Sequence, residues 1–142
     1  MELIKPLDAT VSIIVPYQDA DPAGFVWHGN YFRYFDAARC ALLDKLDYGY
    51  RVMEESGFLW PIVDTRVKFV KPACFDQVIA VTARMLEWEY RVKIAYTVCD
   101  ESGVCLTKGH TIQVAVNISN REMHVGAPEA LETRLRSRGY IE

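Results

Sequence analysis

The side chains best suited to chemistry lie in one short stretch, Tyr17–Tyr31, which reads YQDADPAGFVWHGNY. It contains two carboxylates, Asp19 and Asp21, and one histidine, His28, and it leads into the strongest predicted helix. A carboxylate can attack a carbonyl carbon directly or activate a water molecule. The unpaired N–H groups at a helix start can stabilise the oxyanion that this attack creates. The stretch therefore predicts attack on a carbonyl with a good leaving group, as in a thioester.

Other interpretations of the same aspartates are weaker. A calcium loop that begins DxDxxG requires Asp or Asn at its fifth position and Glu at its twelfth, where this chain has Ala23 and Asn30. A phosphatase with an aspartate nucleophile requires a doubly wound parallel sheet, which the order of predicted elements does not give. Aspartates are also common as turn and capping residues. We favour that structural role for Asp19, and from the residues alone it is also the default for Asp21.

A broadly apolar helix is predicted for Tyr31–Asp47, directly after the aspartate stretch. Its apolar arc is wider than the stripe of an ordinary surface helix, so other elements must enclose it. We expect Asn30 to cap its start and Gly49 to end it. A short helix over Tyr50–Ser56, closed by Gly57, and a C-terminal helix from about Pro128 to Arg138 are also predicted.

The remaining elements are strands that alternate apolar and polar residues. They are predicted at Val11–Val15, Leu59–Val70, Val78–Glu89, Arg91–Cys99 and Val104–Asn117. In the last strand, the apolar residues in phase are Val104, Leu106, Ile112, Val114 and Val116. Asp100–Gly103 is a predicted hairpin turn, and strands joined by short turns pair antiparallel. An α+β fold is expected, in which the antiparallel sheet wraps around the long central helix, the arrangement called the hotdog fold.

Length and composition indicate one domain over residues 1–142, with a net charge of −3. That balance argues against nucleic-acid binding, and no apolar run is long enough for membrane insertion. The start of the chain lacks the features of a secretory signal, so we expect a cytoplasmic protein. The four cysteines have no metal-ligand spacing, and we predict free thiols and no metal site.

The segment DADPAGFVWHGNYFRYFDAAR resembles the active-site signature of the 4-hydroxybenzoyl-CoA thioesterase family, which has the hotdog fold, and it is close to the acyl-CoA thioesterases associated with the Tol-Pal system. The resemblance continues through WPIVDTRVKFVKPACFDQV and so covers most of the chain. It implies hydrolysis of an acyl thioester of coenzyme A or of an acyl carrier protein. It also implies that Asp21 is the catalytic carboxylate and that His28 stands at the place where a backbone N–H polarises the carbonyl.

The same resemblance implies the other site residues. Gly29, Asn30 and Tyr31 stand at the helix start, and Trp60 stands where the family lines its acyl pocket, to which Phe25 and Trp27 could also contribute. Arg91 and Lys93 are the candidates for binding coenzyme A phosphates, although the basic cluster of the family is replaced here by Glu89 and Tyr90. Coenzyme A or phosphopantetheine would enter as part of the substrate, and no separate cofactor is expected.

A curved sheet with open strand edges is expected to associate. We therefore predict a homo-oligomer, either a dimer or a homotetramer. Two other functions remain open. One is a hotdog dehydratase that acts on hydroxyacyl thioesters, which also uses a carboxylate and a histidine near the helix. The other is a non-catalytic protein that binds acyl thioesters and releases no thiol.

Overall fold

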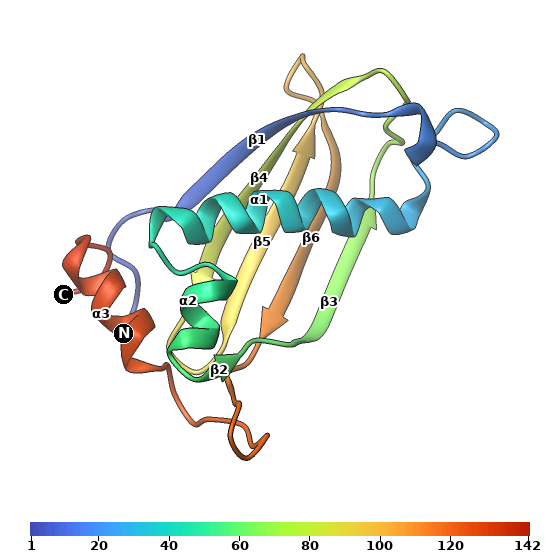
Figure 1. The fold of residues 1–142 in the computed structure, drawn as a ribbon. Helices are drawn as coiled ribbons and strands as arrows, with labels where there is room; N and C mark the ends of the chain where they lie inside the picture. Colours follow the sequence, from blue (N-terminus) through green and yellow to red (C-terminus); the bar gives the residue numbers. More distant parts are fainter.

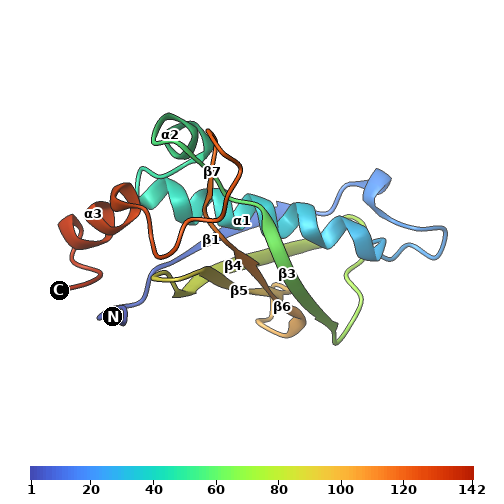
Figure 2. The same ribbon diagram turned by 90° about the horizontal axis from the view of Figure 1, so that it is seen from below.

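A long helix lies across one face of a five-stranded antiparallel sheet in the computed structural model, which describes residues 1–142 (Figure 1). The helix, α1 (Tyr31–Lys45), begins at the predicted residue. In the perpendicular view it forms a separate layer over the sheet (Figure 2). The side of α1 that faces the sheet is buried, as its broad apolar arc requires. The buried side chains are Tyr31, Tyr34, Phe35, Ala38, Arg39, Leu42 and Leu43.

The sheet has the strand order β1-β4-β5-β6-β3, and every neighbouring pair is antiparallel. Its strands are β1 (Asp8–Ile14), β3 (Ile62–Phe69), β4 (Val78–Glu87), β5 (Val92–Cys99) and β6 (Cys105–Gln113). A separate two-stranded pair consists of β2 (Phe58–Leu59) and β7 (Val116–Asn117). Two of the predicted strands are therefore each divided in two. The predicted α+β architecture, a sheet curved around a central helix, is confirmed.

Shorter helices complete the chain. The helix α2 (Tyr50–Glu55) and the C-terminal helix α3 (Glu129–Ser137) lie close to their predicted positions. Two single turns of 3-10 helix, η1 (Tyr17–Asp19) and η2 (His28–Asn30), bracket the aspartate loop. None of the helices combines the length and the apolar character that crossing a membrane requires.

Two central strands present the predicted apolar faces to α1. Alternate residues of β4 and β5 are buried, and the intervening residues are more exposed. The aromatic ring of Phe35 on α1 stacks on that of Tyr96 on β5, with ring centroids 4.4 Å apart. The buried set is Ile79, Val81, Ala83 and Met85 on β4, and Val92, Ile94, Tyr96 and Val98 on β5.

The strand β6 differs from its prediction. Residues that pair directly across antiparallel strands point to the same side of the sheet. The helix-facing residues of β5 pair with Thr107, Gly109, Thr111 and Gln113. The side of β6 toward α1 is therefore small and polar, and Ile112 lies on the opposite side. Leu106 stands at a register shift between β5 and β6 and belongs to the hydrophobic core. The apolar pattern had suggested the reverse, because Ile112 is buried on the outer side and burial alone does not identify the side that faces the helix.

Both predicted ends of α1 need correction. Asn30 has helical backbone angles and its side chain makes no capping hydrogen bond. It instead donates through Nδ2 to the Asp19 carbonyl oxygen at 2.9 Å. At the other end, the residue in the left-handed region is Asp47, with φ 51°, and Gly49 is the residue before α2. Short polar side chains tolerate this region, so an aspartate fills the place expected of glycine.

Candidate active site

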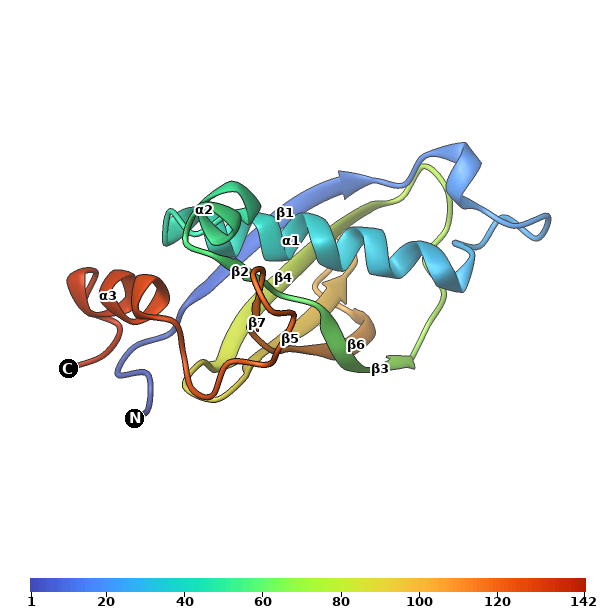
Figure 3. The ribbon, with the colours of Figure 1, turned by 60° about the horizontal axis from the view of Figure 1, so that its bottom comes forward.

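The aspartate loop between β1 and α1 is held against the segment that joins β3 to β4. The Val26 N–H donates to the Ala73 carbonyl oxygen at 2.8 Å, and Phe25 forms an isolated bridge with Cys74. The loop projects past the end of the sheet at the start of α1 (Figure 3). Residues far apart in the sequence therefore meet at the N-terminal end of the helix.

Asp21 is oriented by the backbone of its own loop. Its Oδ1 accepts hydrogen bonds from the N–H groups of Ala23, at 2.9 Å, and Phe25, at 3.2 Å. The turn closes through Gly24, whose φ of 85° favours a residue without a Cβ. No group of the chain donates to the second carboxylate oxygen, Oδ2, and the residue is only half-buried. One oxygen thus fixes the side chain and the other is free to react.

A cavity of about 240 Å³ lies beside this carboxylate at the start of α1. Aromatic, aliphatic and polar side chains from three segments share its wall, and these include His28 and Tyr31. The Tyr31 hydroxyl oxygen accepts from the Ala73 N–H at 3.2 Å, which ties the helix to the far wall. The lining residues are Asp21, Val26, Trp27, His28, Tyr31, Phe69, Val70, Lys71 and Pro72.

The turn before α1 offers two backbone donors. The first hydrogen bond of the turn runs from the Asn30 N–H to the Trp27 carbonyl oxygen at 2.9 Å, so the N–H groups of His28 and Gly29 have no acceptor within the chain. A Cβ on Gly29 would lie 2.2 Å from the Trp27 ring, so only glycine allows that ring to fold over the turn. The His28 side chain is exposed beside the cavity. These donors suit a developing oxyanion.

Asp19, two residues before Asp21, is instead part of the framework. Its carboxylate is buried and accepts from the Tyr34 hydroxyl at 2.7 Å and from the Arg33 guanidinium at 2.6 Å. Burial, and then the hydrogen bond to Asp19, raise the pKa of Tyr34 above its ordinary range. The hydrogen bond to Asp19 also raises the pKa of Arg33. Asp19 therefore anchors the loop to α1 and has no free oxygen facing the cavity.

The predicted site residues fall into three groups within one chain. Asp21, His28 and Tyr31 share the cavity, and Gly29 and Asn30 belong to the turn beside it and do not line the cavity. Trp60 lies elsewhere, in the wall of a second and mostly apolar cavity of about 420 Å³ near α2. Its indole N–H donates to the Tyr48 hydroxyl at 3.2 Å.

Arg91 and Lys93 form the third group, at the opposite end of the sheet. Phe69, in the cavity wall, is aligned through β6 with Val98 on β5. Lys93 lies five residues before Val98, which is about 17 Å along a strand. Arg91 donates to Glu87 at 3.0 Å. Neither cation reaches the Asp21 cavity of its own chain.

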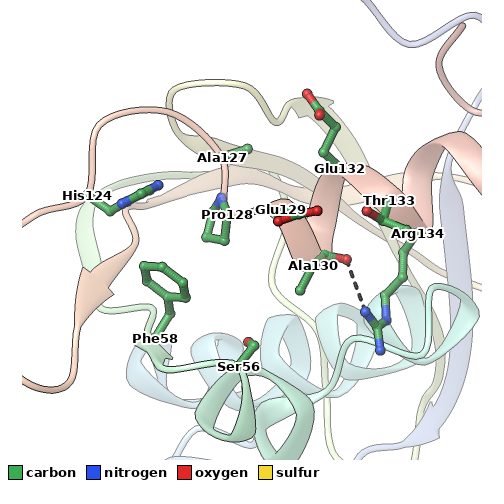
Figure 4. Close-up of a pocket in the computed structure, with 10 residues that line it drawn as sticks. All are labelled: Ser56, Phe58, His124, Ala127, Pro128, Glu129, Ala130, Glu132, Thr133 and Arg134. Atoms are coloured by element: carbon green, nitrogen blue, oxygen red, sulfur yellow. Dashed lines mark hydrogen bonds between the residues drawn. The ribbon is translucent and has the colours of Figure 1, made fainter.

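A larger cavity than the one beside Asp21 lies away from these residues. It has a volume of about 750 Å³ between α3 and the residues that follow α2 (Figure 4). His124 lies on one side of it and the carboxylates of α3 on the other (Figure 4). The Arg134 guanidinium donates to the Ala130 carbonyl oxygen at 3.1 Å, within its own helix. No group of three or more potential metal ligands forms here or elsewhere.

Sequence reasoning missed the far wall of the Asp21 cavity. Phe69, Val70, Lys71 and Pro72 come from the end of β3 and the segment after it. The only signal was the proline that ends the predicted strand. Because these residues lie about forty positions beyond the helix start, only the tertiary fold brings them to the aspartate.

The sequence of this chain matches a known protein family. Residues 15–135 match the model of the Thioesterase-like superfamily. A 1,4-dihydroxy-2-naphthoyl-CoA hydrolase from Thermosynechococcus vestitus is 27% identical over 126 residues, which are 87% of this chain and 85% of that protein. A 4-hydroxybenzoyl-CoA thioesterase from a Pseudomonas species is 34% identical over 80 residues, which are 52% of this chain and 55% of that protein.

Solved structures of thioesterases have a similar fold. The crystal structure of a DHNA-CoA thioesterase from Staphylococcus aureus superposes with a TM-score of 0.79. That alignment covers 95% of this chain and 97% of the other, at 24% identity. The family match extends over most of the sequence and includes the aspartate loop, α1 and all of β3 to β6. This chain therefore belongs to the thioesterase-like superfamily.

Proposed function

We propose that this protein hydrolyses acyl-CoA thioesters and that Asp21 is the catalytic carboxylate. The observation that carries the proposal is the orientation of Asp21, whose Oδ1 is fixed by two backbone N–H groups while Oδ2 remains free beside the cavity at the start of α1. The acyl carbonyl oxygen would accept from the free N–H groups of His28 and Gly29. Those donors are positioned for an oxyanion before the reaction begins.

The reaction then requires few steps. Asp21 takes a proton from water as the water oxygen bonds to the acyl carbon, or it attacks that carbon itself and water cleaves the resulting anhydride. The carbon–sulfur bond breaks, the sulfur leaves and is protonated as the free thiol, and the carboxylic acid is released. The His28 side chain, exposed at the cavity rim, can orient the water or supply the proton to sulfur.

Coenzyme A is the proposed carrier. Both curated relatives described above are named for coenzyme A thioesters with aromatic acyl groups. The Asp21 cavity is small and has three aromatic rings in its wall, those of Trp27, Tyr31 and Phe69. A flat or short acyl group fits such a space better than a long chain. We therefore expect aromatic and short acyl-CoA substrates to be turned over faster than long-chain ones.

We also propose that the working form is a homodimer joined through the β3 edge. The outer edge of β3 has no partner strand, and both faces of the strand are largely exposed. Ile62 is 44% exposed, Val63 57% and Phe69 50%. Antiparallel pairing of two such edges would bring the Trp60 end of one chain toward the Asp21 end of its partner. This supports a role for Trp60 in the acyl pocket of the partner.

The test is thiol release by the wild type and by Asp21→Asn, over a panel of aromatic, short-chain and long-chain acyl-CoA substrates. Because asparagine cannot act as base or nucleophile, we expect kcat to fall by at least ~100-fold. The matched control is Asp76→Asn, in the neighbouring loop outside the cavity, where φ is 67° and asparagine is well tolerated. Its kcat should stay within about twofold, as is usual for surface changes.

Near-normal turnover by Asp21→Asn would refute the assigned role. A wild type that binds acyl-CoA but releases no thiol would indicate a binding protein, and loss of water from a hydroxyacyl substrate without thiol release would indicate a dehydratase. A single turnover in 18O-labelled water tests the nucleophilic role of Asp21. Label that enters the Asp21 carboxylate shows an anhydride cleaved at its aspartyl carbon, an outcome that a general base cannot produce.

A further inference from the structure

The sheet face that points away from α1 bears four basic side chains at one place. They are Arg66 and Lys68 on β3, and Lys108 and His110 on β6. In the register of these strands, Arg66 is directly opposite His110 and Lys68 is directly opposite Lys108. The residues between them, such as Gly109, face the helix, where a Cβ would meet the Phe35 ring at 3.1 Å. The four therefore project together from the outer face, and we call them the outer basic cluster.

No ion pair within the chain neutralises the outer basic cluster. None of its side chains takes part in a salt bridge, although six salt bridges form elsewhere. Asp64 is the only acidic residue on β3 or β6, and it makes no ion pair. Like charges directly opposite each other destabilise a sheet. The chain as a whole has a net charge of −3, so the cluster does not reflect a generally basic surface. Three unpaired cations, Arg66, Lys68 and Lys108, gathered beside His110 indicate an anionic ligand.

The outer basic cluster also surrounds a hollow. A depression of about 500 Å³ is lined by its four members together with Val67 and Gly109. This is enough room for a phosphorylated small molecule but not for the core of a protein interface. Phe69, which follows Lys68 directly, lies in the wall of the Asp21 cavity, where Lys71 adds another cation. A ligand that passes around the end of β3 can therefore occupy both places.

We infer that the outer basic cluster binds the phosphate groups in the nucleotide part of the coenzyme A substrate. This inference rests on the proposed function, and it moves phosphate recognition away from Arg91 and Lys93. Arg91 is already paired with Glu87, and Glu89 lies close by. A second copy of this face is a poor occupant, since a symmetric contact would press like charges together. The cluster instead supplies several donors to a group that carries several negative charges.

The experiment compares wild type with the double variant Lys68→Gln, Lys108→Gln on three thioesters of one acyl group. These are the acyl-CoA, the acyl-dephospho-CoA, which lacks the 3′-phosphate, and the acyl-N-acetylcysteamine, which has no phosphate. We expect KM for acyl-CoA to rise about tenfold or more, the scale of charge-assisted hydrogen bonds to phosphate. The increase should be smaller for acyl-dephospho-CoA and absent for the N-acetylcysteamine thioester, with kcat unchanged throughout.

The matched control is Arg84→Gln, which removes one positive charge from the same sheet face two strands away, on β4. It should leave all three KM values unchanged. Melting temperature gives a second readout that does not need turnover. Without ligand the double variant should be at least as stable as wild type, because a like-charge pair has been removed. Free coenzyme A should raise the melting temperature of wild type more than that of the double variant.

Equal loss on all three thioesters, or no loss on acyl-CoA, would overturn the inference. So would a loss confined to an acyl thioester on an acidic carrier protein, because the cluster would then be a protein-docking surface. These outcomes differ from failure of the proposed function, in which wild type hydrolyses none of the thioesters. In that event, coenzyme A binding measured by calorimetry on wild type and the double variant still tests the phosphate site.

Discussion

Two aspartates two positions apart have opposite surroundings. The carboxylate of Asp19 is 3% exposed and is bonded to two side chains of α1. That of Asp21 is bonded only to its own loop and borders a cavity. The sequence favoured a structural role for Asp19, and the family resemblance implied a catalytic role for Asp21. It expected turn or capping bonds for Asp19, however, and the actual partners are Arg33 and Tyr34, since the loop folds back over the first turn of the helix.

At this scale we predict that Asp19→Ala destabilises the protein by about 2–3 kcal/mol, because the buried Tyr34 hydroxyl loses its acceptor and the loop loses its anchor to α1. The Arg33 bond should add little, since that side chain is 57% exposed. Chemical denaturation of wild type and variant measures the change. The double variant Asp19→Ala, Tyr34→Phe should recover part of the loss, because no buried hydroxyl is then left unpaired. A single variant as stable as wild type would contradict the anchoring role.

At the scale of elements, the distance between α1 and the sheet is set by small residues on β6. Gly109 lies beneath the Phe35 ring, which stacks on Tyr96 of the next strand. The larger side chains that the apolar pattern suggested for this side would push the helix away. The pattern was misleading because it reports burial, and both faces of β6 are buried in places.

We predict that Gly109→Ala destabilises the protein by about 1–3 kcal/mol, the range for overpacking a core. The added Cβ would lie 2.8 Å from the Arg66 carbonyl oxygen and 3.1 Å from Phe35, and the backbone atom cannot move without disturbing β3. Gly49→Ala serves as the control, since its nearest neighbour would be 3.6 Å away and its φ is −74°. Thermal unfolding should separate the two variants clearly. Equal melting temperatures would mean that α1 adjusts freely over β6.

At the scale of the whole molecule, the sheet has an open side that one chain does not close. The β3 edge is unpaired and its apolar residues are exposed, which is unusual for a protein that stays monomeric. The same edge borders the Asp21 cavity through Phe69. Association through β3 would therefore shield apolar surface and help to enclose the substrate.

We predict that the wild-type protein in solution has at least twice the chain mass of 16.2 kDa, as measured by light scattering. The Val63→Lys variant should have a measured mass closer to that of the monomer. A lysine on the edge would lose its hydration in the interface, with no carboxylate of β3 beyond Asp64 to pair with it. The control is Val125→Lys, on a loop residue that is 82% exposed and distant from β3 in the sequence. A monomeric wild type would contradict the assembly, and a dimer insensitive to Val63→Lys would place the interface elsewhere.

The sequence by itself determined the architecture, and its resemblance to a thioesterase family supplied Asp21 as the catalytic candidate. A helix that is apolar over so wide an arc must be enclosed, and four strands with alternating apolar and polar residues can enclose it. One loop at the helix start contains Asp19, Asp21 and His28. These are local properties, because periodicity and loop composition involve residues close together in the chain. Cytoplasmic location, the absence of a cofactor and the extent of the domain remain predictions from sequence.

Only the tertiary structure decided which distant residues meet. It brought the end of β3 to Asp21, separated Trp60, Arg91 and Lys93 from that cavity within one chain, and aligned the outer basic cluster across two strands. The physical reason is strand register. A register shift of one residue exchanges the two faces of a strand, and a register is fixed by the packing of the whole sheet against α1 and not by the sequence of either strand alone.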